Sequence, residues 1–244
     1  MMQLGIIGKS LTHSFSPTYF NEKMKTLNIS GRYDTFELSD IQLFPTLIRS
    51  KPQLIGLNVT IPYKESIIPY LDVLDSSAIT VGAVNCIVIE NGILIGYNTD
   101  ALGFQQALLE IPKAHTMHAL VLGTGGAARA VWTALDNLNI SYKKVSRVHR
   151  ADTIPYEALC KEIIDEHYLI INTTPLGMYP EVDKYPPIPY DLLSAKHVLF
   201  DLIYNPENTK YMQKGSVRGA QVLNGLQMLI NQAEINWKIW NYTK

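Results

Sequence analysis

The chain has 244 residues, enough for one large domain or two smaller ones, and its 47% hydrophobic against 18% charged residues exclude a disordered protein. A formal net charge of −1 excludes a broad electrostatic attraction to nucleic acid or to anionic lipid. There is no apolar run near the roughly 18 residues of a membrane span, and there are only two scattered cysteines. The first residues, MMQLGIIGKS, lack the basic start and the cleavage site of a signal peptide, so none is expected. We therefore expect a soluble cytoplasmic protein without nucleic-acid or membrane partners.

In the first hundred residues, strand patterns alternate with helical patterns. Strands are predicted over 3–8, 32–38 and 54–60, and helices over 17–28, 40–50 and 64–72. Two further strands flank Asn91-Gly92, a dipeptide that favours a tight turn, so residues 83–97 are predicted to form a β-hairpin. These elements indicate a mixed α/β structure.

A second block, after Asp100, alternates more regularly. Helices are predicted over 101–110, 127–138 and 226–240, and strands over 119–123, 143–148, 168–172 and 197–204. Strands separated by helices indicate a parallel sheet with right-handed crossovers. The fold class is therefore α/β, with a boundary near residue 100.

A glycine-rich turn, GTGGAAR, directly follows the apolar strand that ends at residue 123 and opens a helix. Gly123, Gly125 and Ala128 match G-x-G-x-x-A, the dinucleotide-binding fingerprint. Gly123 permits the tight turn, Gly125 lets the backbone approach a pyrophosphate, and Ala128 allows close packing of helix on strand. A glycine turn without a ligand is the alternative interpretation.

The segment after the next strand indicates which dinucleotide is bound. An NAD site usually has an acidic residue about 20 positions after the glycines, yet no Asp or Glu stands between Asp136 and Asp152. Basic side chains occupy the segment instead: Lys143, Lys144, Arg147, His149 and Arg150. A guanidinium suits the 2′-phosphate of NADP, so the pattern favours NADP over a merely solvated basic loop.

Small polar side chains stand beside the apolar strands of the first block. Asn58 and Thr60 are two apart, so they project from one face of an extended chain, and Lys64 follows them. Further members of the set are Ser14, Ser16, Asn85 and Asp100. Neutral hydrogen-bonding groups with one cation and one carboxylate suit a small polyhydroxylated acid.

Each of these residues also has a purely structural interpretation. Ser16, before Pro17, has the pattern of a helix N-cap, and Asp100 has the pattern of a cap for the helix over 101–110. Lys64 could be a surface lysine, and the two asparagines could pair with backbone groups. Their joint occurrence favours a binding site.

Eight segments resemble, in this order, the shikimate dehydrogenase family: HSFSP, NVTIPYK, GAVN, NTD, GTGGAAR, NTTPLGM, DLIY and NGLQMLINQA. The resemblance runs from residue 4 to about residue 235. It implies an N-terminal mixed α/β substrate domain, residues 1–100 completed by a C-terminal helix at 226–244, and a doubly wound Rossmann NADP-binding domain, residues 101–225. The implied activity is reversible NADPH-dependent reduction of 3-dehydroshikimate to shikimate, a step of aromatic amino acid biosynthesis.

The resemblance also implies the site residues. Lys64 and Asp100 would be the catalytic pair, with Lys64 either donating a proton or stabilising charge. Ser14 and Ser16 would bind the substrate carboxylate. The side chains implied at the ring hydroxyls are those of Asn58, Thr60, Asn85, Asp100 and Gln232, with Tyr204 also reaching the substrate. The implied cofactor-binding residues are Gly123, Gly125, Gly126, Ala127, Ala128, His149, Arg150, Asn172, Thr173, Thr174, Leu202 and Gly225.

The sequence departs from the family pattern at the predicted 2′-phosphate site. His149-Arg150-Ala151 stands where the family commonly has Asn-Arg-Thr, so we expect a weaker hold on that phosphate. Two alternative functions remain: a quinate/shikimate dehydrogenase that prefers NAD, and a non-catalytic NADP-binding sensor. His115 and His118 lack a third ligand, so no metal is expected. The assembly is expected to be a monomer or a homodimer.

Overall fold

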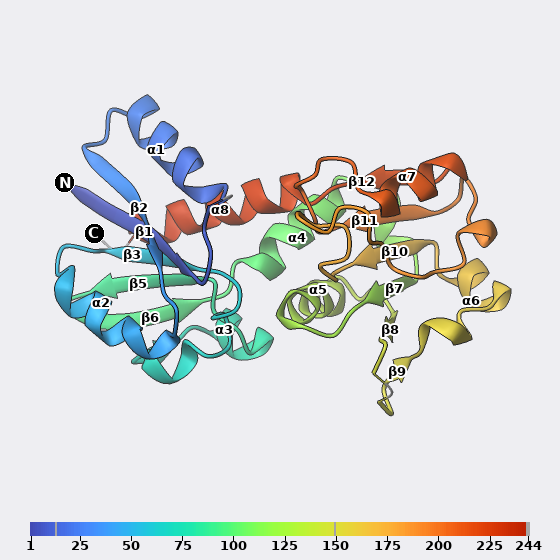
Figure 1. Ribbon diagram of the computed structural model, residues 1–244, viewed down its shortest axis with the longest axis horizontal. Coiled ribbons are helices and arrows are strands. Elements are labelled where there is room, and N and C mark those ends of the chain that lie inside the picture. The colour runs from blue at the N-terminus through green and yellow to red at the C-terminus, as the bar shows by residue number, and fades with distance from the viewer. Residues whose placement is uncertain (13, 149, 243–244) are drawn as a thin grey trace. The chain divides into compact units, whose positions relative to one another are not determined.

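The computed structural model describes residues 1–12, 14–148 and 150–242 (Figure 1). The chain divides into two compact units, one formed by Met1–Thr99 with Ala233–Lys244 and the other by Asp100–Gln232. The division falls inside the last helix, whereas the predicted domain boundary precedes this helix. The predicted domain ranges and their roles stay predictions.

The first unit contains a six-stranded mixed sheet with the strand order β2-β1-β3-β5-β6-β4. Its strands are β1 Met2–Gly8, β2 Gly31–Glu37, β3 Gly56–Val59, β4 Val73–Leu74, β5 Cys86–Glu90 and β6 Ile93–Tyr97. Its helices are α1 Ser16–Thr26, α2 Phe44–Ser50, α3 Ser76–Val81 and part of α8 Leu226–Tyr242, with short 3₁₀ turns η1 Ile41–Leu43 and η2 Ile68–Tyr70. Strand β1 is parallel to β2 and β3, whereas β5 is antiparallel to β3 and β6.

Helices cover both faces of this sheet (Figure 1). On β1, Ile6 contributes to a core shared with α1 and α8, and its neighbour Ile7 contributes to a core shared with α2 and α3. Successive strand residues point to opposite faces, so a sheet buried on both sides needs apolar residues at consecutive positions. Cys86 belongs to the first of these cores and is fully buried, as predicted.

The predicted hairpin is confirmed. Strands β5 and β6 pair in register around Asn91 and Gly92, which have φ angles of 51° and 81°. Two consecutive positive φ angles characterise a type I′ turn, for which Asn-Gly is the preferred sequence.

The predicted helix over 64–72 is wrong. The structure has turns there, and only η2 is helical. Pro69 lacks the N–H that an α-helix would need at this position, and it disfavours the helical conformation of the residue before it. Lys64 therefore lies in a turn rather than at the start of a helix.

The second unit contains a six-stranded parallel sheet with the order β12-β11-β10-β7-β8-β9. Its strands are β7 Ala119–Leu122, β8 Tyr142–Val145, β9 Thr153–Ile154, β10 Leu169–Asn172, β11 Val198–Asp201 and β12 Gln221–Leu223. Its helices are α4 Asp100–Leu109, α5 Gly126–Asn137, α6 Lys161–Glu166, α7 Lys210–Val217 and the start of α8, with 3₁₀ turns η3 Ala114–Thr116, η4 Tyr156–Ala158 and η5 Tyr190–Leu192. Numbered within this unit, the strand order is 3-2-1-4-5-6, that of the doubly wound dinucleotide fold.

Consecutive residues of the central strand β7 face different cores. Ala119 and Val121 pack with α4 and α5, whereas Leu120 and Leu122 pack with α6 and α7. Burial on both faces explains why this strand reads as an uninterrupted apolar run. Among the described residues, no helix is long and apolar enough to cross a membrane.

Gly56 provides a test of how α8 is held on the first sheet. A Cβ at this position would overlap the indole of Trp240, which is buried and whose Nε1 donates a hydrogen bond to the Ile87 carbonyl at 3.0 Å. Gly56→Ala must displace the ring and break this bond, so we expect a loss of about 2–4 kcal/mol in the free energy of unfolding. Urea titration followed by tryptophan fluorescence measures it.

The exposed Ile79 of α3 supplies the control, because Ile79→Ala should change the free energy of unfolding by less than about 0.5 kcal/mol. Equal stability of the Gly56→Ala and wild-type proteins would show that α8 is not held in this way.

Candidate active site

The glycine turn after β7 is packed against the loop after β10. Gly123 has a φ of 110°, which favours glycine, and a Cβ there would lie 2.7 Å from Thr173 Oγ1. Thr173 in turn donates to the Leu122 carbonyl through its N–H, at 3.0 Å, and through its hydroxyl, at 2.7 Å. Strands β7 and β10 are the neighbours at which the strand order reverses. In this fold, ligands bind at the carboxyl ends of the strands at that point.

The first turn of α5 fits a phosphate group. Gly125 is the N-cap residue and makes no side-chain capping bond, and Gly126 and Ala127 follow in the first turn. A Cβ built on Gly125 would meet no atom within 4 Å, so the space beside this backbone is open. Ala128 is fully buried, where it lets the helix approach the sheet closely. N-terminal N–H groups and the helix dipole favour an anion at such a position.

Asn172, at the end of β10, is held by a carboxylate on the neighbouring strand. Its Nδ2 donates to Asp201 Oδ1 at 2.9 Å. The amide oxygen of Asn172 then accepts from both the backbone N–H and the hydroxyl of Thr174. Asp201 also accepts from Thr209 Oγ1 at 2.6 Å and from the Ile203 N–H at 3.1 Å. The loop after β10 is thus shaped by Asp201, a residue that the sequence reasoning missed.

Leu202 and Gly225 bring two more strand ends to this edge. The Leu202 N–H donates to the Asn172 carbonyl at 3.0 Å, and a Cβ on Gly225 would overlap the Leu202 carbonyl oxygen. The structure therefore gathers the predicted cofactor residues of β7, β10, β11 and β12 at the carboxyl edge of one sheet. Asn224, beside Gly225, accepts from the Leu226 N–H at the start of α8.

The predicted 2′-phosphate loop is only partly described, because His149 lies outside the described residues. Arg150 is exposed, and its N–H and carbonyl both bond to Thr153. Nearby, Lys144 Nζ lies 2.9 Å from Asp152, and the hydrogen bond from this lysine lowers the pKa of Asp152. Lys144 thereby neutralises the negative charge of Asp152, the one carboxylate in the loop that is expected to bind the 2′-phosphate.

In the first unit, Ser16 does not cap α1. The N-cap residue is Phe15, without a side-chain capping bond, and Ser16 is the first helical residue. The buried Ser16 side chain instead lies near the hydroxyl of Tyr33 on β2, where it lowers the pKa of this tyrosine against the larger effect of burial. The N-cap alternative for this serine is therefore wrong.

Asn58 and Asn85 are buried and hydrogen-bonded to protein groups. Asn58 accepts from the Tyr33 hydroxyl at 2.7 Å and donates to the Asn85 carbonyl at 3.0 Å. Asn85 Nδ2 donates to Thr99 Oγ1 at 3.0 Å, and its Oδ1 accepts from the Thr99 N–H at 2.8 Å. Thr99 also donates to Asn236 of α8 at 2.6 Å. Five segments of the first unit are joined in this way.

Ser14, Thr60 and Lys64 are half-buried in the same unit. The Lys64 carbonyl accepts from the Val84 N–H at 2.7 Å, and the Asn85 carbonyl accepts from the Val59 N–H at 2.9 Å. The turn that carries Lys64 and the end of β3 are therefore both fastened to the segment around Asn85.

The remaining predicted residues belong to the second unit. Asp100 is the first residue of α4, where a carboxylate interacts favourably with the helix dipole. Gln232 lies on α8, and a Cβ on Gly103 of α4 would come within 2.9 Å of Gln232 Cβ. Tyr204 is half-buried after β11. Because Lys64 and Asp100 belong to different units, their pairing stays a prediction.

Comparison with known proteins identifies the family. Residues 6–87 match the family model for the shikimate dehydrogenase substrate-binding domain. A shikimate dehydrogenase (NADP(+)) from Methanococcus maripaludis strain C6 is 38% identical, over 99% of this chain and 92% of the relative. The chain belongs to the shikimate dehydrogenase family.

Two further relatives support this assignment. A shikimate dehydrogenase (NADP(+)) from Desulforamulus reducens is 37% identical, and the match covers 97% of this chain and 88% of the relative. The crystal structure of shikimate 5-dehydrogenase from Thermus thermophilus, in complex with NADP(H) and shikimate, matches with a TM-score of 0.88. It is 29% identical and covers 98% of this chain and 93% of that chain. The α/β fold with a doubly wound sheet is confirmed.

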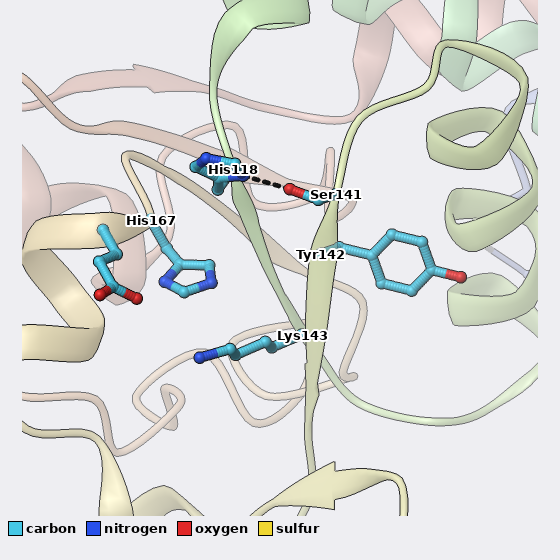
Figure 2. A pocket seen from close by; sticks show the side chains of 6 residues that line it. His118, Ser141, Tyr142, Lys143 and His167 are labelled. Atoms are coloured by element: carbon cyan, nitrogen blue, oxygen red, sulfur yellow. Dashed lines mark hydrogen bonds between the residues drawn. The ribbon is translucent and has the colours of Figure 1, made fainter.

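A cavity of about 470 Å³ lies at the opposite, amino-terminal edge of the second sheet (Figure 2). It is lined by His118, Ser141, Tyr142, Lys143, Glu166 and His167. His118 hydrogen-bonds to Ser141, and burial lowers the pKa of His167. This cavity contains no predicted site residue. Among the described residues, no group of three or more His, Cys, Asp or Glu could hold a metal ion.

Asp201 generates a pH-dependent prediction. Burial raises the pKa of Asp201 from 3.8 to about 6, against the opposing effect of its three hydrogen bonds. Between these values the folded state binds more protons than the unfolded state, so the free energy of unfolding should fall as the pH rises. The loss should be about 2–2.5 kcal/mol between pH 4 and pH 7.

Asp201→Asn keeps the shape of the side chain and removes this titration. The free energy of unfolding is measured against pH for wild type and for Asp201→Asn, and the second profile is subtracted from the first. The contributions of all other carboxylates are common to both proteins and cancel in this difference. Parallel stability profiles for wild type and Asp201→Asn would contradict the raised pKa.

Proposed function

We propose that this protein catalyses the reversible reduction of 3-dehydroshikimate to shikimate, with NADPH as the hydride donor. The observation that carries the proposal is similarity over 99% of the chain to an NADP-dependent shikimate dehydrogenase. The match to the substrate-binding domain includes Ser14, Ser16, Asn58, Thr60, Lys64 and Asn85. We assign the substrate to residues 1–100 with 226–244, and the cofactor to residues 101–225.

The cofactor would be held at the carboxyl edge of the second sheet. The first turn of α5 offers N–H groups for the pyrophosphate, and the loops of Thr173, Thr174 and Gly225 meet at the same edge. His149 and the exposed Arg150 would hold the 2′-phosphate, because a guanidinium provides paired donors for phosphate oxygens. Bound NADPH supplies the hydride.

The substrate would be positioned by the polar groups of the first unit together with Asp100, Tyr204 and Gln232. Ser14 and Ser16 would bind its carboxylate, and the amides of Asn58 and Asn85 would contact its ring hydroxyls. Hydride addition to a ketone creates an alkoxide, and the Lys64 ammonium would stabilise or protonate this oxygen. Asp100 would orient the ammonium and accept a substrate hydroxyl.

Lys64 is the residue on which the chemistry most depends. We expect Lys64→Ala to lower kcat by roughly 10²-fold or more with KM little altered, because the group acts on charge that develops in the transition state. The rate is followed by NADPH absorbance with 3-dehydroshikimate as substrate. Lys25→Ala, at an exposed position of α1, is the matched control and should leave kcat unchanged. A variant with normal kcat and a raised KM would make Lys64 a binding residue.

Gly125 tests the placement of the cofactor. Gly125→Ala should lower the free energy of unfolding by no more than about 1 kcal/mol, because the added Cβ meets no protein atom within 4 Å and only the preference for glycine over alanine at an N-cap is lost. It should weaken NADPH binding about tenfold if the pyrophosphate approaches this backbone. NADPH fluorescence titration measures the dissociation constant. Gly123→Ala is the contrasting variant, because its positive φ and the nearby Thr173 predict a loss of stability. Equal NADPH affinity of Gly125→Ala and wild type would place the cofactor elsewhere.

A quinate/shikimate dehydrogenase that prefers NAD is the second candidate. A shikimate 5-dehydrogenase from Listeria monocytogenes, 26% identical with a TM-score of 0.81, has been crystallised with shikimate and NAD. Ala151 also removes a hydroxyl from the expected phosphate loop. Steady-state rates with NADPH and NADH, on shikimate and on quinate, separate the two candidates. Tight NADPH binding without any turnover would instead indicate a sensor. We also propose a cytoplasmic location and a monomer or homodimer.

A further inference from the structure

A series of hydrogen bonds joins Tyr33 to two of the predicted substrate-binding residues, Asn58 and Asn85, and a third, Ser16, lies beside the same tyrosine. Tyr33 is buried on β2, and its hydroxyl donates to Asn58 at 2.7 Å. The Ser16 side chain lies close enough to the same hydroxyl to lower the pKa of Tyr33 against the larger effect of burial. Asn58 continues the series to the carbonyl of Asn85. These residues come from three strands or their flanking segments and from one helix, all within the first unit.

The chemistry of the groups fixes the direction of each bond. A backbone carbonyl can only accept, so Asn58 must turn Nδ2 toward Asn85 and Oδ1 toward Tyr33. Tyr33 must therefore donate its proton to Asn58, which leaves the tyrosine oxygen as an acceptor on the side of Ser16. Burial raises the pKa of Tyr33 well above its ordinary value, so the hydroxyl keeps this proton near neutral pH.

This arrangement leaves a defined part of the Asn58 amide for a ligand. One N–H and one oxygen lone pair remain, a donor beside an acceptor. A ring hydroxyl both donates and accepts, so it can use both groups together. Without Tyr33, Asn58 Oδ1 would lose the only donor that the described residues direct to it, and the amide would be held by the Asn85 carbonyl alone.

We propose that Tyr33 is a positioning residue for the substrate, acting through the orientation of Asn58 and Ser16. The inference rests on the proposed function, because it takes these two residues to contact the substrate. Tyr33 touches neither substrate nor cofactor in this role. Binding of the substrate carboxylate turns the Ser16 proton to the acid, while Tyr33 continues to donate to Asn58.

The ring of Tyr33 has a separate, structural role that the test must leave intact. It stacks on Phe20 with ring centroids 4.9 Å apart and lies near Trp240. Tyr33→Phe retains the ring and removes only the oxygen. Circular dichroism and the melting temperature report whether the fold is retained.

We expect Tyr33→Phe to raise KM for shikimate about 3–10-fold, the range of one lost hydrogen bond, while kcat and KM for NADP stay within about twofold. Tyr211→Phe is the matched control. Tyr211 is equally buried, belongs to the second unit and donates one hydrogen bond, to the Ile170 carbonyl at 2.8 Å. The control should lose comparable stability without any change in KM for shikimate.

A double-mutant cycle separates positioning from general loosening of the fold. When Asn58 is already alanine, Tyr33→Phe should raise KM by less than about twofold, because its main target is gone. The role of Tyr33 would be overturned if Tyr33→Phe left KM unchanged. It would also be overturned if KM in the double variant rose by the product of the increases caused by Tyr33→Phe and Asn58→Ala alone. Absence of turnover by the wild-type protein would overturn the proposed function itself, and the two failures are thereby distinguished.

Discussion

Burial of polar groups in an apolar sheet is the constraint on which the first unit depends. An asparagine on an inner strand is tolerated only when its amide is hydrogen-bonded, since an unpaired buried group costs about 1–3 kcal/mol. Asn58 meets this requirement through Tyr33 and the Asn85 carbonyl, and Asn85 meets it through Thr99. The partners come from distant segments, so satisfying the amides also fixes how those segments lie. Stability and the shape of the proposed substrate site therefore have the same origin.

The second unit applies the same constraint with a charged group. Asp201 is fully buried and accepts three hydrogen bonds, one of which orients Asn172. Asn172 then accepts from Thr174 and shapes the loop that packs against Gly123. A buried carboxylate is expensive, and replacing it by an apolar residue would leave Asn172 without its partner. Asp201 thus shapes the loop at the carboxyl edge of the second sheet, where the cofactor is proposed to bind, without needing to touch the cofactor itself.

Local patterns in the sequence were sufficient for much of this structure. The Asn91-Gly92 hairpin, the glycine turn and the apolar strand β7 depend on a few adjacent residues, and each formed where it was expected. The apolar residues at helical spacing after Lys64 predict a helix over 64–72, but Pro69 prevents it and only a short 3₁₀ turn forms. Short elements such as β4, β9 and α6 carry too few residues to show a period.

The residues that organise the site were harder to find than those that would contact ligands. Nothing local distinguishes Tyr33 among 14 tyrosines, because its role depends on a strand 25 positions away. Asp201 and Asn236 did leave signals. Asp201 interrupts the apolar run HVLFDLIY, and Asn236 stands at helical spacing with the buried Ala233, Trp237 and Trp240. A polar residue on an apolar face must have a buried partner, and a sequence shows this requirement without naming the partner.

Asn236 shows how such a partner constrains the chain at the proposed catalytic centre. It accepts from Thr99, which Asn85 also holds by two bonds, so the residue that precedes Asp100 is fixed from two directions. Asp100 follows as the first residue of α4, where the helix sets the direction in which the chain continues. A carboxylate that must orient an ammonium needs a defined origin, because small displacements of reacting groups cost large factors in rate. In the proposed mechanism Thr99 gives Asp100 this fixed starting point, and Asn236 of the last helix is one of the groups that hold Thr99.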